Sequence, residues 1–268
     1  MVISNMREVV KWMKFEPGTY YKFVALVRAK DFNDTVEPVL YAEKNKELFV
    51  RQWFIDSEEA LEKNWENMLC LCEALKARLY VTTDRKSTKK TIIKMQEQLF
   101  DYSKQLLSNP NISLSLSLRK LSKFSASASQ LAECSDGPKY WMIDIDGNGL
   151  EDKGAQVKGR VVWGLMLYFS HDIFHPKQVF THQTPNGYHI LVERDFDIKK
   201  YMNDFLGGKP LAFKLGKTSE NLTVQLEPNR EQEIREFLIQ WKDNWSIKEN
   251  ALTLAYFNNG VEEKKVTL

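Results

Sequence analysis

The segment 140–149 constrains the fold most, because an unbroken apolar run ends there in two aspartates and a glycine-bearing turn. Its sequence is Tyr-Trp-Met-Ile-Asp-Ile-Asp-Gly-Asn-Gly. Residues two apart in an extended strand share a face, so we expect Asp144 and Asp146 to project together, opposite Ile143 and Ile145. A continuous apolar run suits burial on both faces of a sheet. The segment is therefore predicted to contain a strand that ends at Asp146 and is central in the mixed sheet of an α/β protein, with a turn at the glycines that follow.

The two aspartates favour a cation site at the end of this strand. Two carboxylates a few ångströms apart repel each other unless a cation or a proton lies between them. Proteins commonly hold Mg²⁺ through one or two carboxylates together with substrate phosphates. A pair of solvated aspartates at a strand end is the alternative, and the apolar run before the pair and the glycines after it favour the metal site.

Length and composition indicate an ordinary globular protein. The chain has 268 residues, of which 43% are hydrophobic, enough for one large domain or two small ones with a packed core. No apolar run approaches the roughly 20 residues of a membrane span, and the N-terminus lacks the layout of a signal peptide. We therefore expect a cytoplasmic protein with no membrane partner. The three cysteines fit neither a disulfide framework nor a zinc site.

Basic residues are concentrated between Lys76 and Lys123. That stretch holds eleven lysines and arginines against three acidic residues, while the whole chain has a formal net charge of only +2. Such clustering is typical of a phosphate-binding face, although a solvated helix surface gives the same count. Arg85 and Lys86 lie between a predicted strand at 78–83 and a predicted helix at 88–107, where a loop and helix N-terminus can bind phosphate. A plain charged turn is the alternative for these two residues.

A predicted hairpin supplies the next candidate residues. Strands at 178–184 and 188–192 flank Thr-Pro-Asn-Gly at 184–187, and Pro followed by Asn-Gly is a strong turn signal. His189 then lies at the start of the second strand, after a flexible backbone that would let a triphosphate approach, with Asn186 in the turn. Further on, Glu220 lies at the entrance of a predicted strand at 222–226.

This order of motifs resembles the archaeo-eukaryotic primase superfamily, the primase-polymerases. The family's hallmarks are an apolar strand ending in Asp-x-Asp/Glu, a small-x-His motif and a third acid at a strand, which match Asp144 and Asp146, Gly187 to His189, and Glu220. The strand 77–81 with Arg85, and the strand opening at Tyr21, also look like those of uncharacterised phage-encoded relatives. The resemblance runs from about residue 20 to 230. It implies an α/β (α+β) fold with a mixed sheet, an RRM-like primase-polymerase catalytic core and flanking helices.

We expect a single domain over 1–268, with 1–76 as an N-terminal αβ subregion and 77–268 carrying the catalytic core. The resemblance implies that Asp144 and Asp146 bind Mg²⁺ or Mn²⁺ at a nucleoside triphosphate and that His189 contacts its phosphates. The third motif would supply another metal-binding acid. The family usually has Asp at that place, whereas this chain offers Glu220 or Glu227.

The expected activity is that of a metal-dependent nucleotidyltransferase, a primase-polymerase acting on DNA or RNA and nucleoside triphosphates, in the host cytoplasm if the chain is phage-encoded. Two alternatives stay open. One is a catalytically degenerate protein that binds nucleic acid or nucleotides on the same scaffold, and the other is a metal-dependent nuclease. A ligase is less attractive because Lys-x-Asp-Gly is absent, and a Walker-type kinase because Gly-x-x-x-x-Gly-Lys-[Ser/Thr] is absent.

Overall fold

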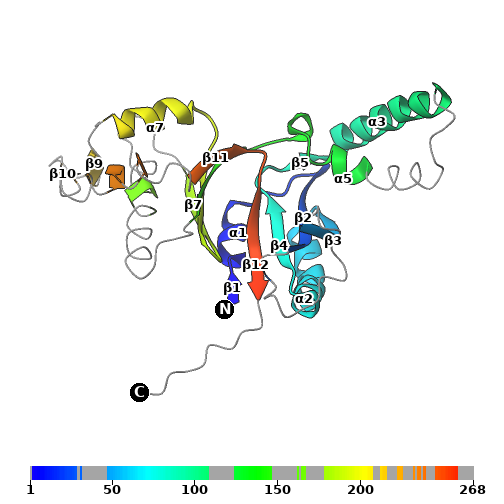
Figure 1. Cartoon of the computed structure of the whole chain (residues 1–268), viewed down its shortest axis with the longest axis horizontal. Coiled ribbons are helices and arrows are strands. Elements are labelled where there is room, and N and C mark those ends of the chain that lie inside the picture. Colours follow the sequence, from blue (N-terminus) through cyan, green and yellow to red (C-terminus); the bar gives the residue numbers. More distant parts are fainter. Residues whose placement is uncertain are drawn as a thin grey trace, which may run out of the picture. The chain divides into compact units, whose positions relative to one another are not determined.

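In the computed structural model the chain forms two compact units. Figure 1 labels their helices and strands. Unit 1 comprises Met1–Ser4, Met13–Pro138 and Ala255–Leu268, and unit 2 comprises Asn5–Trp12 and Lys139–Leu254. The expectation of a single domain with subregions 1–76 and 77–268 stays a prediction. The structure describes residues 2–28, 31, 47–108, 124–146, 162, 164–166, 178–207, 212–215, 222–225, 232, 234–236, 238–239 and 245–258.

The described part of unit 1 is built on a six-stranded sheet. Its strands follow the order β1-β12-β4-β2-β3, and β5 pairs with β2. They are β1 (Val2–Ser4), β2 (Thr19–Arg28), β3 (Glu47–Ile55), β4 (Arg78–Thr82), β5 (Lys86–Ser87) and β12 (Leu252–Asn258), and from Ala255 onward β12 belongs to this unit. The helices are α2 (Glu58–Leu75), α3 (Thr88–Ser108), α5 (Phe124–Ala128) and the 3₁₀ turn η2 (Ala132–Cys134).

Unit 2 carries the strand with the two aspartates. Over the described residues, its main sheet has four strands in the order β11-β6-β8-β7, and β9 and β10 form a separate pair. The elements are α1 (Met6–Trp12), β6 (Tyr140–Asp146), β7 (Val179–Thr184), β8 (Gly187–Glu193), α7 (Ile198–Leu206), β9 (Ala212–Leu215), β10 (Leu222–Gln225) and β11 (Trp245–Glu249). The fold is thus α+β, as the sequence predicted at the level of class.

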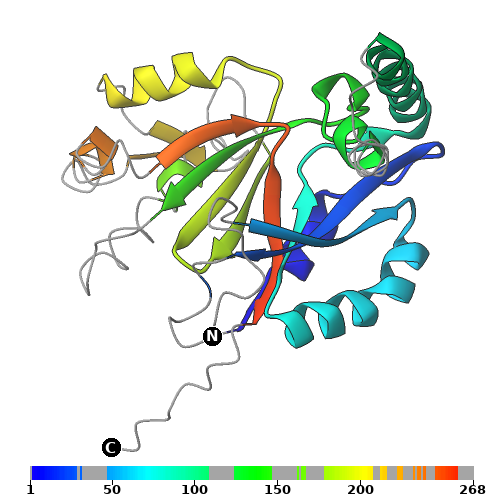
Figure 2. The same ribbon diagram turned by 45° about the vertical axis from the view of Figure 1, so that its right-hand side comes forward.

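The prediction of a central strand ending at Asp146 is confirmed, because β6 lies between β11 and β8. Ile143 and Ile145 are fully buried and pack in an apolar cluster with residues of β8 and α7, which is the yellow helix of Figure 2. The opposite face of β6 is also apolar at its start, where Tyr140 lies edge-on to Trp12 of α1 at 5.7 Å between ring centroids.

The expected mixed sheet is wrong for this part of the molecule, since β6 pairs antiparallel with both neighbours and β7 pairs antiparallel with β8. A continuous apolar run indicates that the strand is buried on both faces of its sheet. Here Trp12 and the α7 cluster supply that burial, so no parallel neighbour is required.

The predicted hairpin is confirmed, but Gly187 is required for the packing of two strands and not for the geometry of the turn. β7 ends at Thr184 and β8 begins at Gly187, so Pro185 and Asn186 form a two-residue connection. A Cβ atom on Gly187 would lie 1.8 Å from the carbonyl oxygen of Ile145. Glycine is therefore required because the backbones of β6 and β8 approach closely at this point.

Candidate functional site

A row of four polar side chains crosses the sheet of unit 2. In the strand registers Ser246 of β11 lies opposite Asp144 of β6, Asp144 opposite His189 of β8, and His189 opposite His182 of β7. Cross-strand partners share a face of the sheet, so all four side chains lie on the face opposite the buried Ile143. The two aspartates and the histidine that the sequence singled out are therefore brought together on adjacent strands.

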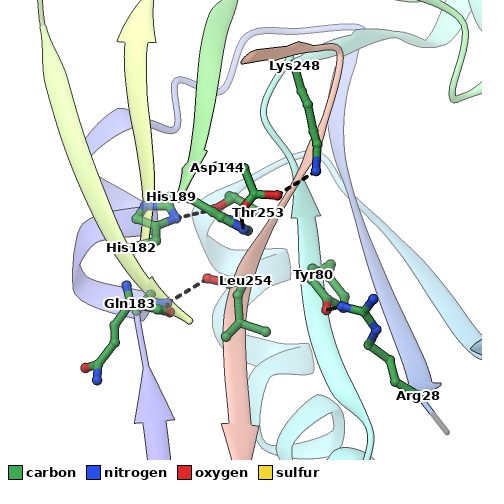
Figure 3. A network of polar contacts seen from close by, with 10 residues as sticks. Arg28, Tyr80, Asp144, His182, Gln183, His189, Lys248, Thr253 and Leu254 are labelled. Atoms are coloured by element: carbon green, nitrogen blue, oxygen red, sulfur yellow. Dashed lines mark hydrogen bonds and ion pairs between the residues drawn. The ribbon is translucent and has the colours of Figure 1, made fainter. Parts of the chain in front are cut away.

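Asp144 is the centre of this row and each of its carboxylate oxygens has a basic neighbour. Oδ1 lies 3.4 Å from Nε2 of His189, and Oδ2 accepts a hydrogen bond of 2.6 Å from Nζ of Lys248 (Figure 3). Burial by itself would raise the pKa of this carboxyl, but the hydrogen bond and charge of His189, followed by those of Lys248, outweigh burial and lower the pKa to about 2. Asp144 is thus held as a carboxylate at neutral pH.

Asp146 ends β6 on the same face and is exposed to solvent. Its partner in the register is Gly187, and the partly exposed Asn186 directly precedes that glycine in the turn. The end of β6 and the β7–β8 turn therefore lie together. Asp144, Asp146, Asn186 and His189 form the candidate site.

A group of buried polar side chains holds the other ring nitrogen of His189, Nδ1. This nitrogen lies 3.0 Å from the hydroxyl of Thr253 on β12, and the same hydroxyl lies 2.7 Å from Nδ1 of His182 (Figure 3). The indole N–H of Trp12 donates to Nε2 of His182 at 3.2 Å. Burial, with a smaller effect from the charge of His189, lowers the pKa of His182 to about 3, so this ring is neutral at physiological pH.

The two carboxylates fit a hard divalent ion in donor type, because oxygen ligands are what Mg²⁺ and Mn²⁺ prefer. The ammonium of Lys248 is the group that such an ion would replace at Asp144. Within the described ranges no group of three or more His, Cys, Asp and Glu side chains is placed to hold a metal. The expected third acid, Glu220 or Glu227, lies outside the described residues.

Arg85 and Lys86 belong to unit 1 and are buried there, with 3% and 0% of their surface exposed. Arg85 donates to the carbonyl oxygens of Asp136 and Lys14, each at 2.9 Å. Lys86 donates to the hydroxyl of Ser135 at 2.9 Å. Both side chains thus hold loops of unit 1 in place, and the phosphate contact expected through them stays a prediction.

Sequence reasoning missed Lys248, Thr253 and His182. Two of them had a usable signal. The segment Trp-Ser-Ile-Lys at 245–248 alternates apolar and polar residues, which predicts a half-buried strand with Lys248 on its polar face. A two-residue turn at Pro185 and Asn186 also fixes the register that places His182 opposite His189. Thr253 gave no such signal, because it contacts His189 from 64 residues further along the chain.

No family model, curated protein or solved structure matches this chain. In the part of the chain that the structure describes, no helix is long and apolar enough to cross a membrane.

Proposed function

We propose that this chain is a metal-dependent nucleotidyltransferase of primase-polymerase type that acts on nucleic acid and nucleoside triphosphates with Mg²⁺ or Mn²⁺. One observation carries the proposal. Asp144 and Asp146 share a face of β6, and His189 lies directly opposite Asp144 on the adjacent strand. This arrangement gathers two carboxylates and one imidazole N–H donor at the end of a strand beside a tight turn. The order of motifs along the sequence supports the same reading.

The residues of the site divide into two roles under this proposal. Asp144 and Asp146 would hold the divalent ion, which supplies activation of a hydroxyl nucleophile and stabilisation of the leaving pyrophosphate. His189 presents Nε2 on the side of Asp144 and contacts an anionic oxygen of the nucleotide, and Asn186 lies in the turn beside it. Glu220 is the proposed third acid.

Lys248 must leave Asp144 before a metal ion binds there. Its side chain is 48% exposed, so the ammonium can turn into solvent, where it regains its hydration. An exposed ion pair contributes at most about 1 kcal/mol, which is small beside the attraction between a divalent cation and two carboxylates. In the absence of metal, the ammonium offsets the repulsion that the two aspartates would otherwise feel.

The decisive experiment incubates the purified protein with a labelled primer-template, nucleoside triphosphates and Mn²⁺ or Mg²⁺. We expect the primer to be extended by the wild type but not by the double variant Asp144→Asn, Asp146→Asn, which keeps side-chain volume and removes both charges. Asp195→Asn, an exposed aspartate of the same unit, is the matched control and should retain extension. Shortening of the primer would instead identify a nuclease.

A second candidate function is a binding protein without turnover, and the ion pair between Lys248 and Asp144 favours it. A lysine seated on the first carboxylate gives the site a stabilised state that needs no metal. In that case the wild type and Lys248→Met would both bind a labelled nucleotide, and neither would change the primer. Extension by either protein would exclude this candidate.

A further inference from the structure

Hydrogen bonds connect Trp12, His182, Thr253 and His189 in that order. Their direction is fixed because the indole of Trp12 can only donate. The indole of Trp12 has one donor, its N–H, and cannot accept a hydrogen bond. Nε2 of His182, at 3.2 Å, must therefore be the acceptor. A neutral imidazole carries its single proton on the other nitrogen. The proton of His182 is therefore on Nδ1, the atom that faces the hydroxyl of Thr253 at 2.7 Å.

Thr253 passes this direction on to His189. Its hydroxyl accepts from Nδ1 of His182, which leaves its own hydrogen to donate. Among the described residues the remaining contact of that hydroxyl is Nδ1 of His189, at 3.0 Å. Thr253 is fully buried, with 0% of its surface exposed, so the hydroxyl does not face bulk water. Nδ1 of His189 is accordingly an acceptor without a proton.

We propose that Thr253 and His182 are positioning residues that lock His189 in the tautomer with its proton on Nε2, the nitrogen that faces Asp144. Four consecutive donors then point the same way, from Trp12 through His182, Thr253 and His189 to the carboxylate. Such aligned chains polarise and strengthen one another. The lock concerns the free protein and does not depend on the proposed function.

The alternative tautomer of His189 is disfavoured at both of its nitrogens. With the proton on Nδ1, two N–H groups would point at Thr253, and the threonine hydrogen would lose its acceptor in a buried place. The bare lone pair of Nε2 would also face the carboxylate oxygen of Asp144 at 3.4 Å. A buried donor left without its hydrogen bond shifts such an equilibrium by on the order of tenfold or more.

The lock gives His189 a defined use under the proposed function, on which this step rests. The 3.4 Å separation between Nε2 and Asp144 is longer than a strong hydrogen bond to a carboxylate, so the N–H remains available to a better acceptor placed beside it. If Asp144 turns to a metal ion, a fixed N–H donor faces the space beside it. The ligand chemistry that matches this donor is an anionic phosphate oxygen of a nucleoside triphosphate.

The test reads the tautomer directly, by ¹⁵N NMR of the imidazole nitrogens well above the ordinary histidine pKa of about 6.5. The chain has four histidines, and the variants His189→Gln and His182→Gln assign two of them by loss of signal. We expect the wild type to show a protonated Nε2 and a hydrogen-bonded, unprotonated Nδ1 at His189. We expect the opposite arrangement of protons, on Nδ1, at His182.

Variants of Thr253 separate the lock from packing. Thr253→Val keeps the shape without the hydroxyl and should move the His189 signals toward a mixture of tautomers, whereas Thr253→Ser should keep the wild-type pattern. Thr91→Val, which removes another buried hydroxyl in unit 1, should leave His189 unchanged. A wild-type proton on Nδ1 of His189, or signals unchanged in Thr253→Val, would overturn the lock. If Thr253→Val does not fold, the wild-type spectrum decides alone.

Calorimetry with ATP and dATP in the presence of Mn²⁺ tests the functional step separately. We expect Thr253→Val to bind the nucleotides roughly two- to tenfold more weakly, the cost of one misdirected hydrogen bond, and Thr253→Ser to bind as the wild type does. Absence of nucleotide binding with the expected tautomer intact would overturn the proposed function and leave the lock standing. Nucleotide binding equal in wild type and Thr253→Val would overturn the role given to the N–H of His189.

Discussion

Lys248 of β11 donates a 2.6 Å hydrogen bond to Oδ2 of Asp144 on the neighbouring strand, although Ser246 is the residue directly opposite that aspartate. The lysine therefore reaches the carboxylate diagonally across the two strands. Its ammonium offsets the negative charge of Asp144, which shares a face of β6 with Asp146. This relationship makes Lys248 the competitor of any cation at the site.

Lys248→Met should therefore strengthen binding of a divalent ion. The variant keeps the apolar stem and removes the ammonium that occupies Oδ2. Because the lysine is half exposed, the gain in Mn²⁺ affinity should be modest, roughly two- to fivefold, in line with the energy of surface ion pairs. Calorimetric titration of Mn²⁺ measures it, with Lys199→Met on the exposed side of α7 as the control. Weaker Mn²⁺ binding in Lys248→Met would show that the lysine supports the site.

The lowered pKa of Asp144 predicts a loss of stability in acid. The pKa of Asp144 is about 2 in the folded protein against 3.8 ordinarily. As the pH falls, the Asp144 carboxylate is therefore protonated in the unfolded chain before it is protonated in the folded protein. The stabilisation is fully present above pH 3.8 and is lost as pH falls through about 2. Its size is about 1–2 kcal/mol once solvent screening is allowed for. Urea unfolding of wild type and Asp144→Asn should show a difference that shrinks between pH 5 and 2.

The same substitution should cost far more stability at Lys86 than at Lys89. Lys86 is fully buried and donates to Ser135, whereas Lys89 lies exposed on α3. Lys86→Glu replaces an internally bonded ammonium with an unpaired buried carboxylate, which should cost more than about 3 kcal/mol of unfolding free energy. Lys89→Glu should change it by no more than about 0.5 kcal/mol. Equal effects in urea unfolding would contradict the structural role of Lys86.

Several elements of the fold could be predicted from the sequence because their signals are local. Ser57 accepts a hydrogen bond from the backbone N–H of Ala60 as the N-cap of α2, and Asp197 does the same for Lys199 and Lys200 at α7. Such caps lie within a few residues of what they stabilise. The period of two along β6 likewise placed Asp144 and Asp146 on one face and Ile143 on the other.

The remainder of the site depends on pairings that no local pattern contains. Lys248 is 104 residues from Asp144, and Thr253 is 64 residues from His189. The burial of Arg85 and Lys86 has the same origin, since the groups that bond them lie about fifty residues further along the chain or, for Lys14, about seventy residues earlier. A cluster of basic residues in a sequence does not distinguish exposed lysines from lysines that hold loops, because both have the same composition.

Gly187→Ala should destabilise unit 2 strongly. Its Cβ atom would lie 1.8 Å from the carbonyl oxygen of Ile145, so β6 and β8 would have to separate beside Asp146. Forced backbone shifts of this kind cost about 1–3 kcal/mol or more. Gly18→Ala is the control, because its Cβ would meet no atom within 4 Å, and the cost there is about 1 kcal/mol from a φ of +76° alone. Comparable thermal shifts in the two variants would show that the strands do not approach so closely.

His182 predicts a second, separate loss of stability at mildly acidic pH. Burial lowers its pKa from 6.5 to about 3, so below pH 6.5 the unfolded chain binds a proton that the folded chain does not. Stability should then fall as the pH falls from 6.5 toward 3, by at most on the order of 1 kcal/mol for each pH unit. His182→Gln, which keeps an acceptor for Trp12, removes this proton and should flatten the dependence, although it is less stable at pH 8. Urea unfolding at several pH values measures both slopes, and equal slopes in the two proteins would mean that His182 is protonated in the fold.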